Sequence, residues 1–145
     1  MTGSTGLPET GSGGRRVEHI GIAVRKLDEA VRRYEALLGV ACYGIEAVED
    51  QGVNTAFFRL GDVKIELLES ASPDGPLGKF LETRGEGLHH IAYRVPDVAE
   101  ALRQAEAAGF RLIDKEPRRG AEGMLIAFVH PKSTGGVLTE FCQIP

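Results

Sequence analysis

The stretch Gly87-Leu88-His89-His90-Ile91-Ala92-Tyr93-Arg94-Val95 decides the fold. A glycine precedes it, β-forming residues fill it and Pro96-Asp97 follows it, so it is predicted to be a strand. A similar stretch, Val17-Glu18-His19-Ile20-Gly21-Ile22-Ala23-Val24, lies 71 residues earlier. Further identities at that offset are Ile20/Ile91, Val24/Val95, Glu29/Glu100, Ala30/Ala101, Arg32/Arg103, Glu35/Glu106 and Ala36/Ala107. The pattern predicts one module written twice, with a histidine near the start of each copy.

The two adjacent histidines, His89 and His90, are predicted to differ in role. Successive side chains of an extended strand point to opposite faces, so only one of the pair can line a given cavity. His90 matches His19 of the first copy, whereas His89 matches Glu18. We therefore expect His90 to face the cavity and His89 to face the other way.

Composition and charge describe an ordinary globular chain. The 145 residues are 42% hydrophobic with a net charge of −4, which argues against a general nucleic-acid binder. No apolar run approaches the length of a membrane span, and two cysteines are too few for a disulfide framework. We expect a cytoplasmic protein with a disordered tail over 1–14 and a single domain over 15–145.

Each module is predicted to fold as a strand, a helix and three strands. The first module, about 16–70, has predicted strands at 16–24, 41–48, 55–60 and 63–68 around a helix at 27–38. The second, about 87–145, begins with a strand at 88 and has a helix with Asp97 as its N-cap. Its further strands are predicted at 111–114, 124–130 and 137–144, and a short helix at 76–84 links the modules. The fold class is α+β, in which two βαβββ modules pair into a cupped mixed sheet around one cleft.

Two glutamates complete a candidate metal site. Glu66 and Glu140 each lie among apolar residues in the last strand of a module. A carboxylate buried in such a strand must be paired, hydrogen-bonded or bound to metal. Together with His19 and His90 they offer four nitrogen and oxygen ligands, which suit a divalent cation.

The double βαβββ pattern with its His-Glu-His-Glu set resembles the vicinal oxygen chelate (glyoxalase-like) superfamily, and within it the methylmalonyl-CoA epimerases. The resembling phrases are His19-Ile20-Gly21-Ile22-Ala23-Val24, Gly78-Lys79-Phe80-Leu81-Glu82, Arg84-Gly85-Glu86-Gly87-Leu88-His89-His90-Ile91-Ala92 and His130-Pro131-Lys132-Ser133-Thr134-Gly135-Gly136-Val137-Leu138-Thr139-Glu140. The first phrase is common in the superfamily, and the last two are long and specific. The likeness extends over 17–143.

The resemblance implies a site, a reaction and partners. Its metal ligands would be His19, Glu66, His90 and Glu140, holding cobalt or manganese in the first place, with zinc, nickel or magnesium as further candidates. The reaction would interconvert the (R) and (S) forms of methylmalonyl-CoA, by removal of the α proton, formation of an enolate and reprotonation on its opposite face. The partners would be an acyl-CoA thioester and, in a homodimer, a second copy of the chain.

Epimerisation needs an acid/base group on each face of the planar enolate. The resemblance assigns one to Glu140, as ligand and base, and the other to a Glu-Gln-Gly phrase that reads Glu49-Asp50-Gln51-Gly52 here. Asp50 occupies the motif position but is one methylene shorter, and Glu49 has the usual length but the wrong register. If this segment is extended, the two face opposite ways. We favour Asp50.

Three other functions and the coenzyme A contacts remain open from the sequence. One alternative is a glyoxalase-I-like isomerase, and another is an extradiol-type dioxygenase, which needs iron held by two histidines and one carboxylate. The third is a ligand-sequestering protein of the same superfamily without catalysis. Candidate cations for the coenzyme A phosphates are Lys79, Arg118, Arg119 and Lys132.

Overall fold

The structure is a computed structural model, and it describes residues 14–145. Apart from Gly14, the predicted tail over 1–14 lies outside the described residues. The first half contains β1 (Arg16–Ala23), α1 (Leu27–Leu38), β2 (Gly44–Val48), a 3-10 turn η2 (Glu49–Gln51), β3 (Val53–Leu60), β4 (Val63–Ser70) and α2 (Pro76–Arg84). The second contains β5 (Gly87–Arg94), α3 (Val98–Ala107), β6 (Arg118–Arg119), η3 (Ala121–Gly123), β7 (Leu125–Val129), η4 (Pro131–Thr134) and β8 (Thr139–Gln143). None of the helices in this part of the chain is long and apolar enough to cross a membrane.

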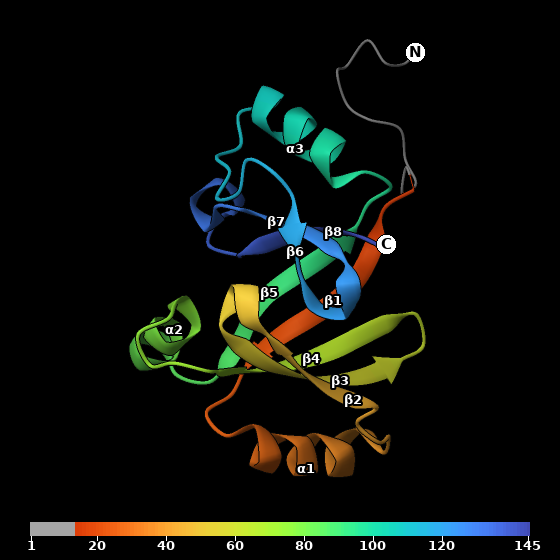
Figure 1. Cartoon of the computed structure of the whole chain (residues 1–145), viewed down its shortest axis with the longest axis vertical. Coiled ribbons are helices and arrows are strands. Elements are labelled where there is room, and N and C mark those ends of the chain that lie inside the picture. The colour runs from red at the N-terminus through yellow and green to blue at the C-terminus, as the bar shows by residue number, and fades with distance from the viewer. Residues whose placement is uncertain (1–13) are drawn as a thin grey trace.

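The strands form one mixed sheet in the order β2-β3-β4-β1-β5-β8-β7-β6. At its centre β1 and β5, the opening strands of the two halves, pair antiparallel. On either side of this seam, β1 pairs parallel to β4 and β5 pairs parallel to β8. Figure 1 shows α1 and α3 at opposite ends of the molecule with the strands between them. The predicted fold class, two βαβββ modules joined in a cupped sheet, is confirmed.

Each long helix packs against the sheet of its own half through a periodic apolar stripe. The core under α1 contains Val24, Leu27, Ala30, Ala56, Phe58 and Leu67, and that under α3 contains Val95, Val98, Ala101, Leu102, Val129 and Phe141. The predicted N-cap of α3 is confirmed, because the Asp97 side chain accepts a hydrogen bond from the Glu100 N–H. With both helices on one face, the other face of the sheet is left to enclose a cleft.

The strand predicted at 111–114 is wrong. Leu112 makes only an isolated bridge with Val129, and the outermost strand is the two-residue β6 instead. The reason is Asp114, whose Oδ2 accepts the Phe128 N–H at 2.8 Å. A side-chain oxygen thus takes a donor that a continuous strand would have paired with its own backbone.

The central seam contains two β-bulges at equivalent positions of the repeat. Along β1 the pairing passes from Val17 to His19 and leaves out Glu18, and along β5 it leaves out His89. A bulge inserts one unpaired residue and re-aims the side chains beside it. The strict alternation predicted for the two adjacent histidines therefore fails, and His89 lines the same cavity as His90. The expectation that His89 faces away from that cavity is wrong.

Candidate metal centre

Three of the four predicted ligands meet inside the curve of the sheet. His19 comes from β1, His90 from β5 and Glu140 from β8, and each is only 3% exposed. The Nε2 atoms of the two histidines are 3.1 Å apart. Glu140 Oε1 lies 3.2 Å from His90 Nε2 and 3.6 Å from His19 Nε2. One ligand atom from each residue lies within 4.8 Å of the others, which is close enough for a single cation to contact all three.

Glu66, the fourth predicted ligand, stands beside this group. Its Oε2 is 3.3 Å from His19 Nδ1, on the other side of that ring from Nε2. The same oxygen is buried and has no hydrogen-bond partner among residues 14–145. A buried carboxylate oxygen without a donor is costly, and a bound cation is one of the few groups that relieves the cost. Two imidazoles and two carboxylates suit a borderline divalent metal, so these residues fit such an ion.

The buried charges hold the cluster together when no metal is bound. Burial lowers the pKa of His19, but the carboxylates of Glu66 and Glu140 outweigh burial and raise this pKa to about 10. Burial raises the pKa of Glu140, but the two histidines outweigh it and hold the pKa below its usual range. For Glu66 burial prevails, and the pKa is raised. At neutral pH a proton on His19 thus occupies the place that a cation would take.

A buried lysine lies directly behind the cluster. Lys64 is 2% exposed, and its Nζ lies 3.1 Å from Glu18 Oε1 and 2.5 Å from Glu122 Oε1. Burial lowers the pKa of Lys64, but the neighbouring carboxylates outweigh burial and raise this pKa. Glu122 reaches the lysine from η3 with a positive φ of 57°. Sequence reasoning missed this network, although Lys64 lies two residues before Glu66 on β4 and so shares its inward face.

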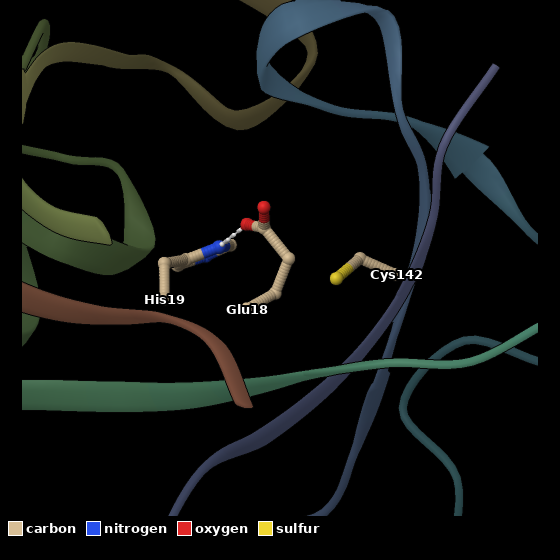
Figure 2. A group of neighbouring side chains, drawn as sticks. All are labelled: Glu18, His19 and Cys142. Carbon is tan, nitrogen blue, oxygen red and sulfur yellow. Dashed lines mark hydrogen bonds and ion pairs between the residues drawn. The ribbon is translucent and has the colours of Figure 1, made fainter. Parts of the chain in front are cut away.

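Figure 2 shows Glu18, His19 and Cys142 as neighbours. The Glu18 carboxylate points at the His19 ring, and the Cys142 sulfur points toward Glu18. Cys142 is fully buried, and burial raises the pKa of its thiol. Because the Lys64 ammonium already neutralises Glu18, this trio is a poor site for a second cation.

A cavity of about 460 Å³ meets the cluster at His90. Its wall includes His89, His90, Phe128 and Leu138 together with the turn η2. This turn contains the candidate second bases Glu49 and Asp50, and both line the cavity. The two are in a 3-10 turn and not an extended segment, so the condition under which they would face opposite ways is not met.

One of the four candidate phosphate-binding cations lines this cavity. Arg118 donates from Nη1 to the Asp50 carbonyl oxygen at 3.3 Å and from Nε to Asp114 Oδ1 at 3.2 Å. It thereby connects β6 of the second half to η2 of the first. Within residues 14–145, the cavity wall does not include Lys79, Arg119 or Lys132.

The sequence of this chain has a match among protein families. The profile of the Glyoxalase/Bleomycin resistance protein/Dioxygenase superfamily matches residues 18–128. The chain belongs to this superfamily.

Relatives in the superfamily point to a narrower group. The chain is 47% identical over 128 residues to the uncharacterized protein YqjC of Bacillus subtilis, covering 88% of this chain and 91% of that protein. It is 37% identical over 131 residues to an ethylmalonyl-CoA/methylmalonyl-CoA epimerase of Cereibacter sphaeroides, covering 89% and 98%. The solved structure of Streptomyces coelicolor methylmalonyl-CoA epimerase in complex with 2-nitronate-propionyl-CoA superposes with a TM-score of 0.86 at 39% identity, covering 89% and 94%. The chain is therefore related to methylmalonyl-CoA epimerases.

Proposed function

We propose that the protein is a metal-dependent epimerase that interconverts the (R) and (S) forms of methylmalonyl-CoA. The observation that supports this most is that the His19, His90 and Glu140 cluster adjoins, through His90, a cavity lined by two further carboxylates, Glu49 and Asp50. The kinship with epimerases of acyl-CoA thioesters agrees with it. The cation we propose is cobalt or manganese, held by His19, Glu66, His90 and Glu140.

The reaction needs one group to remove a proton and another to return one. A bound divalent cation would supply positive charge that stabilises the enolate formed from the thioester. Glu140, kept ionised by the two histidines, accepts or donates a proton on one face of that enolate. Asp50, on the turn at the cavity rim, serves the other face, with Glu49 beside it as the alternative base. The apolar side chains of Phe128 and Leu138 keep water from the reacting carbon.

The coenzyme A part of the bound substrate extends out through the open side of the cavity. Arg118 is the cation of this wall and is placed to meet an anionic part of the acyl-CoA. We also propose a homodimer, which light scattering on the purified protein tests. Parallel assays with ethylmalonyl-CoA show whether the cavity prefers the longer side chain.

Isotope exchange tests the function directly. Protein stripped with chelator and reloaded with Co²⁺ is incubated with one epimer of methylmalonyl-CoA in deuterated water. We expect deuterium at the α carbon together with loss of stereochemical purity. With the epimer whose α proton faces Glu140, Asp50→Asn should allow exchange but block inversion. Glu49→Gln should leave both exchange and inversion unchanged, as should Glu106→Gln on the exposed surface of α3, the charge-matched control. Metal-bound protein without any exchange would refute the epimerase and favour the glyoxalase reading. Protein that binds no metal and has no activity would favour ligand sequestration.

A second candidate rests on Glu66. Because His19, His90 and Glu140 converge without Glu66 within residues 14–145, the cluster also resembles the two-histidine, one-carboxylate set of iron-dependent dioxygenases. Glu66→Gln separates the two. Under the epimerase proposal it weakens Co²⁺ binding, whereas under the dioxygenase proposal it leaves Fe²⁺ binding and oxygen uptake with a catechol unchanged.

A further inference from the structure

The two bulged residues of the central seam occupy matching places relative to the two histidines. Glu18 precedes His19 and His89 precedes His90, and each is the unpaired residue of its bulge. In a regular strand, neighbouring side chains point to opposite faces and cannot touch. The bulges remove this restriction, so each of the two residues can reach the ring that follows it.

Both bulged residues contact the same atom of their histidine. Glu18 Oε1 lies 2.6 Å from His19 Nδ1, the contact drawn in Figure 2. His89 Nδ1 lies 2.9 Å from His90 Nδ1. With Nδ1 engaged in each ring, both Nε2 atoms are left facing each other and Glu140.

We propose that Glu18 and His89 are positioning residues of the metal centre, which hold His19 and His90 as Nδ1–H tautomers and so direct both Nε2 lone pairs at the cation. A histidine that binds metal through one nitrogen donates the proton on its other nitrogen to a neighbouring acceptor, which fixes the ring and raises its basicity. The Glu18 carboxylate is such an acceptor. His89 accepts through Nδ1 when its own proton is on Nε2.

The two positioning residues differ in charge, and their surroundings explain why. On the Glu18 side, the Lys64 ammonium lies 3.1 Å from the accepting oxygen and balances its charge. The residue that corresponds to Lys64 is Leu138, which lies just before β8 and two residues before Glu140, and it lines the open cavity. There the acceptor is an imidazole, whose ring packs edge-on against Phe80 at 4.8 Å. His19 is therefore held by an anion on the closed side and His90 by a neutral ring on the substrate side.

The first test is cation affinity, which depends on the metal centre proposed above and not on the reaction. Metal-free protein is titrated with Co²⁺ in competition with a chelator. We expect Glu18→Ala and His89→Phe each to weaken binding by about 10–100-fold. Glu18→Gln keeps an accepting oxygen and should fall between Glu18→Ala and the unchanged protein. His130→Gln and Glu106→Gln, outside the cluster, should bind like the unchanged protein.

The second test separates positioning from general damage. In Zn²⁺-loaded protein, ¹⁵N-edited NMR should show slowly exchanging Nδ1 protons on His19 and His90. Glu18→Ala should abolish the His19 signal alone, and His89→Phe the His90 signal alone. If Glu18→Ala fails to fold because Lys64 loses one of its carboxylate partners, Glu18→Gln serves in its place and should weaken the His19 signal alone.

Three outcomes would overturn the inference. Variants with the affinity and both NMR signals of the unchanged protein would show that neither residue positions a ligand. Loss of both signals in either variant would show unspecific disruption. An unchanged protein that binds neither Co²⁺ nor Zn²⁺ would refute the metal centre itself, whereas a failure of epimerisation with metal affinities as expected would leave the inference intact.

Discussion

Replacing Gly21 by alanine should disable the metal centre through a single added methyl group. Gly21 lies on β1 directly opposite His90 of β5. A Cβ at this position would lie 2.2 Å from His90 Cε1, 2.5 Å from Nδ1 and 2.8 Å from Nε2. The backbone of Gly21 is not in the left-handed region, so the collision with the ring is the sole source of strain.

The size of the effect follows from these distances. Ordinary contact begins at 3.4 Å, so the ring must retreat by about 1.2 Å at Cε1. Metal–ligand distances tolerate deviations of only about 0.2 Å. Loss of a residue that supports a metal ligand weakens metal binding by up to about 100-fold. Because the ligand itself is displaced here, we expect the Kd for Co²⁺ to rise by at least that factor. Overpacking should also lower the free energy of unfolding of the metal-free protein by about 1–3 kcal/mol.

A matched variant isolates the cause. Gly44→Ala also adds a methyl group to a strand glycine, but the nearest atom to its Cβ would be Phe57 at 3.9 Å. It should bind Co²⁺ like the unchanged protein. Equal affinities for Gly21→Ala and Gly44→Ala would refute the geometry proposed for His90. The internal repeat alone would predict equal affinities for the two variants. The residue equivalent to Gly21 in the second module is Ala92, so the repeat by itself suggests that alanine is tolerated at this position.

Four further predictions concern charged side chains. Because the pKa of His19 is raised to about 10, this ring must lose a proton when Co²⁺ binds at pH 7. Calorimetry in two buffers should therefore show about one proton released per Co²⁺ bound. The affinity for Co²⁺ should rise about tenfold per pH unit at pH values below about 10. The pKa of His19 is higher in the folded protein, about 10, than its ordinary value of 6.5. Protonated His19 therefore stabilises the metal-free fold fully below pH 6.5, and this stabilisation is lost as the pH approaches 10. Thermal denaturation at a series of pH values should show the loss. Lys64→Met should lower the unfolding free energy in urea by about 3 kcal/mol through its orphaned carboxylates, while the exposed Lys26→Met changes little. Arg118→Ala frees the turn bearing Asp50 and should slow inversion about tenfold more than isotope exchange, and equal slowing would contradict that role.

The internal repeat made the fold and the pairing of the two buried histidines predictable. Matching His19 to His90 identified two equivalent strands, and the inward alternation of each module's last strand then pointed to Glu66 and Glu140. These inferences needed only the alternation of side chains along a strand and the fact that the module occurs twice. The structure places His19, His90 and Glu140 together, and the role of Glu66 stays a prediction.

The errors arise where local rules give way to long-range pairing. The bulge at His89 depends on how β5 meets a strand 71 residues away, and nothing within either strand marks it. The 3-10 turn at Glu49 and Asp50 was likewise not predicted, so the condition under which the two would face opposite ways is not met. Glu122 reaches Lys64 across 58 residues, a contact that composition and periodicity do not encode.

The antiparallel seam between β1 and β5 also bears on how long the protein survives in a cell. A chain with one half unfolded offers at most one histidine and one glutamate, so a cation binds tightly only when both halves are paired. Binding to the native state alone stabilises it by about 4 kcal/mol at a thousandfold excess over Kd. The open forms of the chain, which proteases cleave, then become about a thousandfold less populated. The supply of the metal ion would then set the rate at which the protein is degraded as well as its activity.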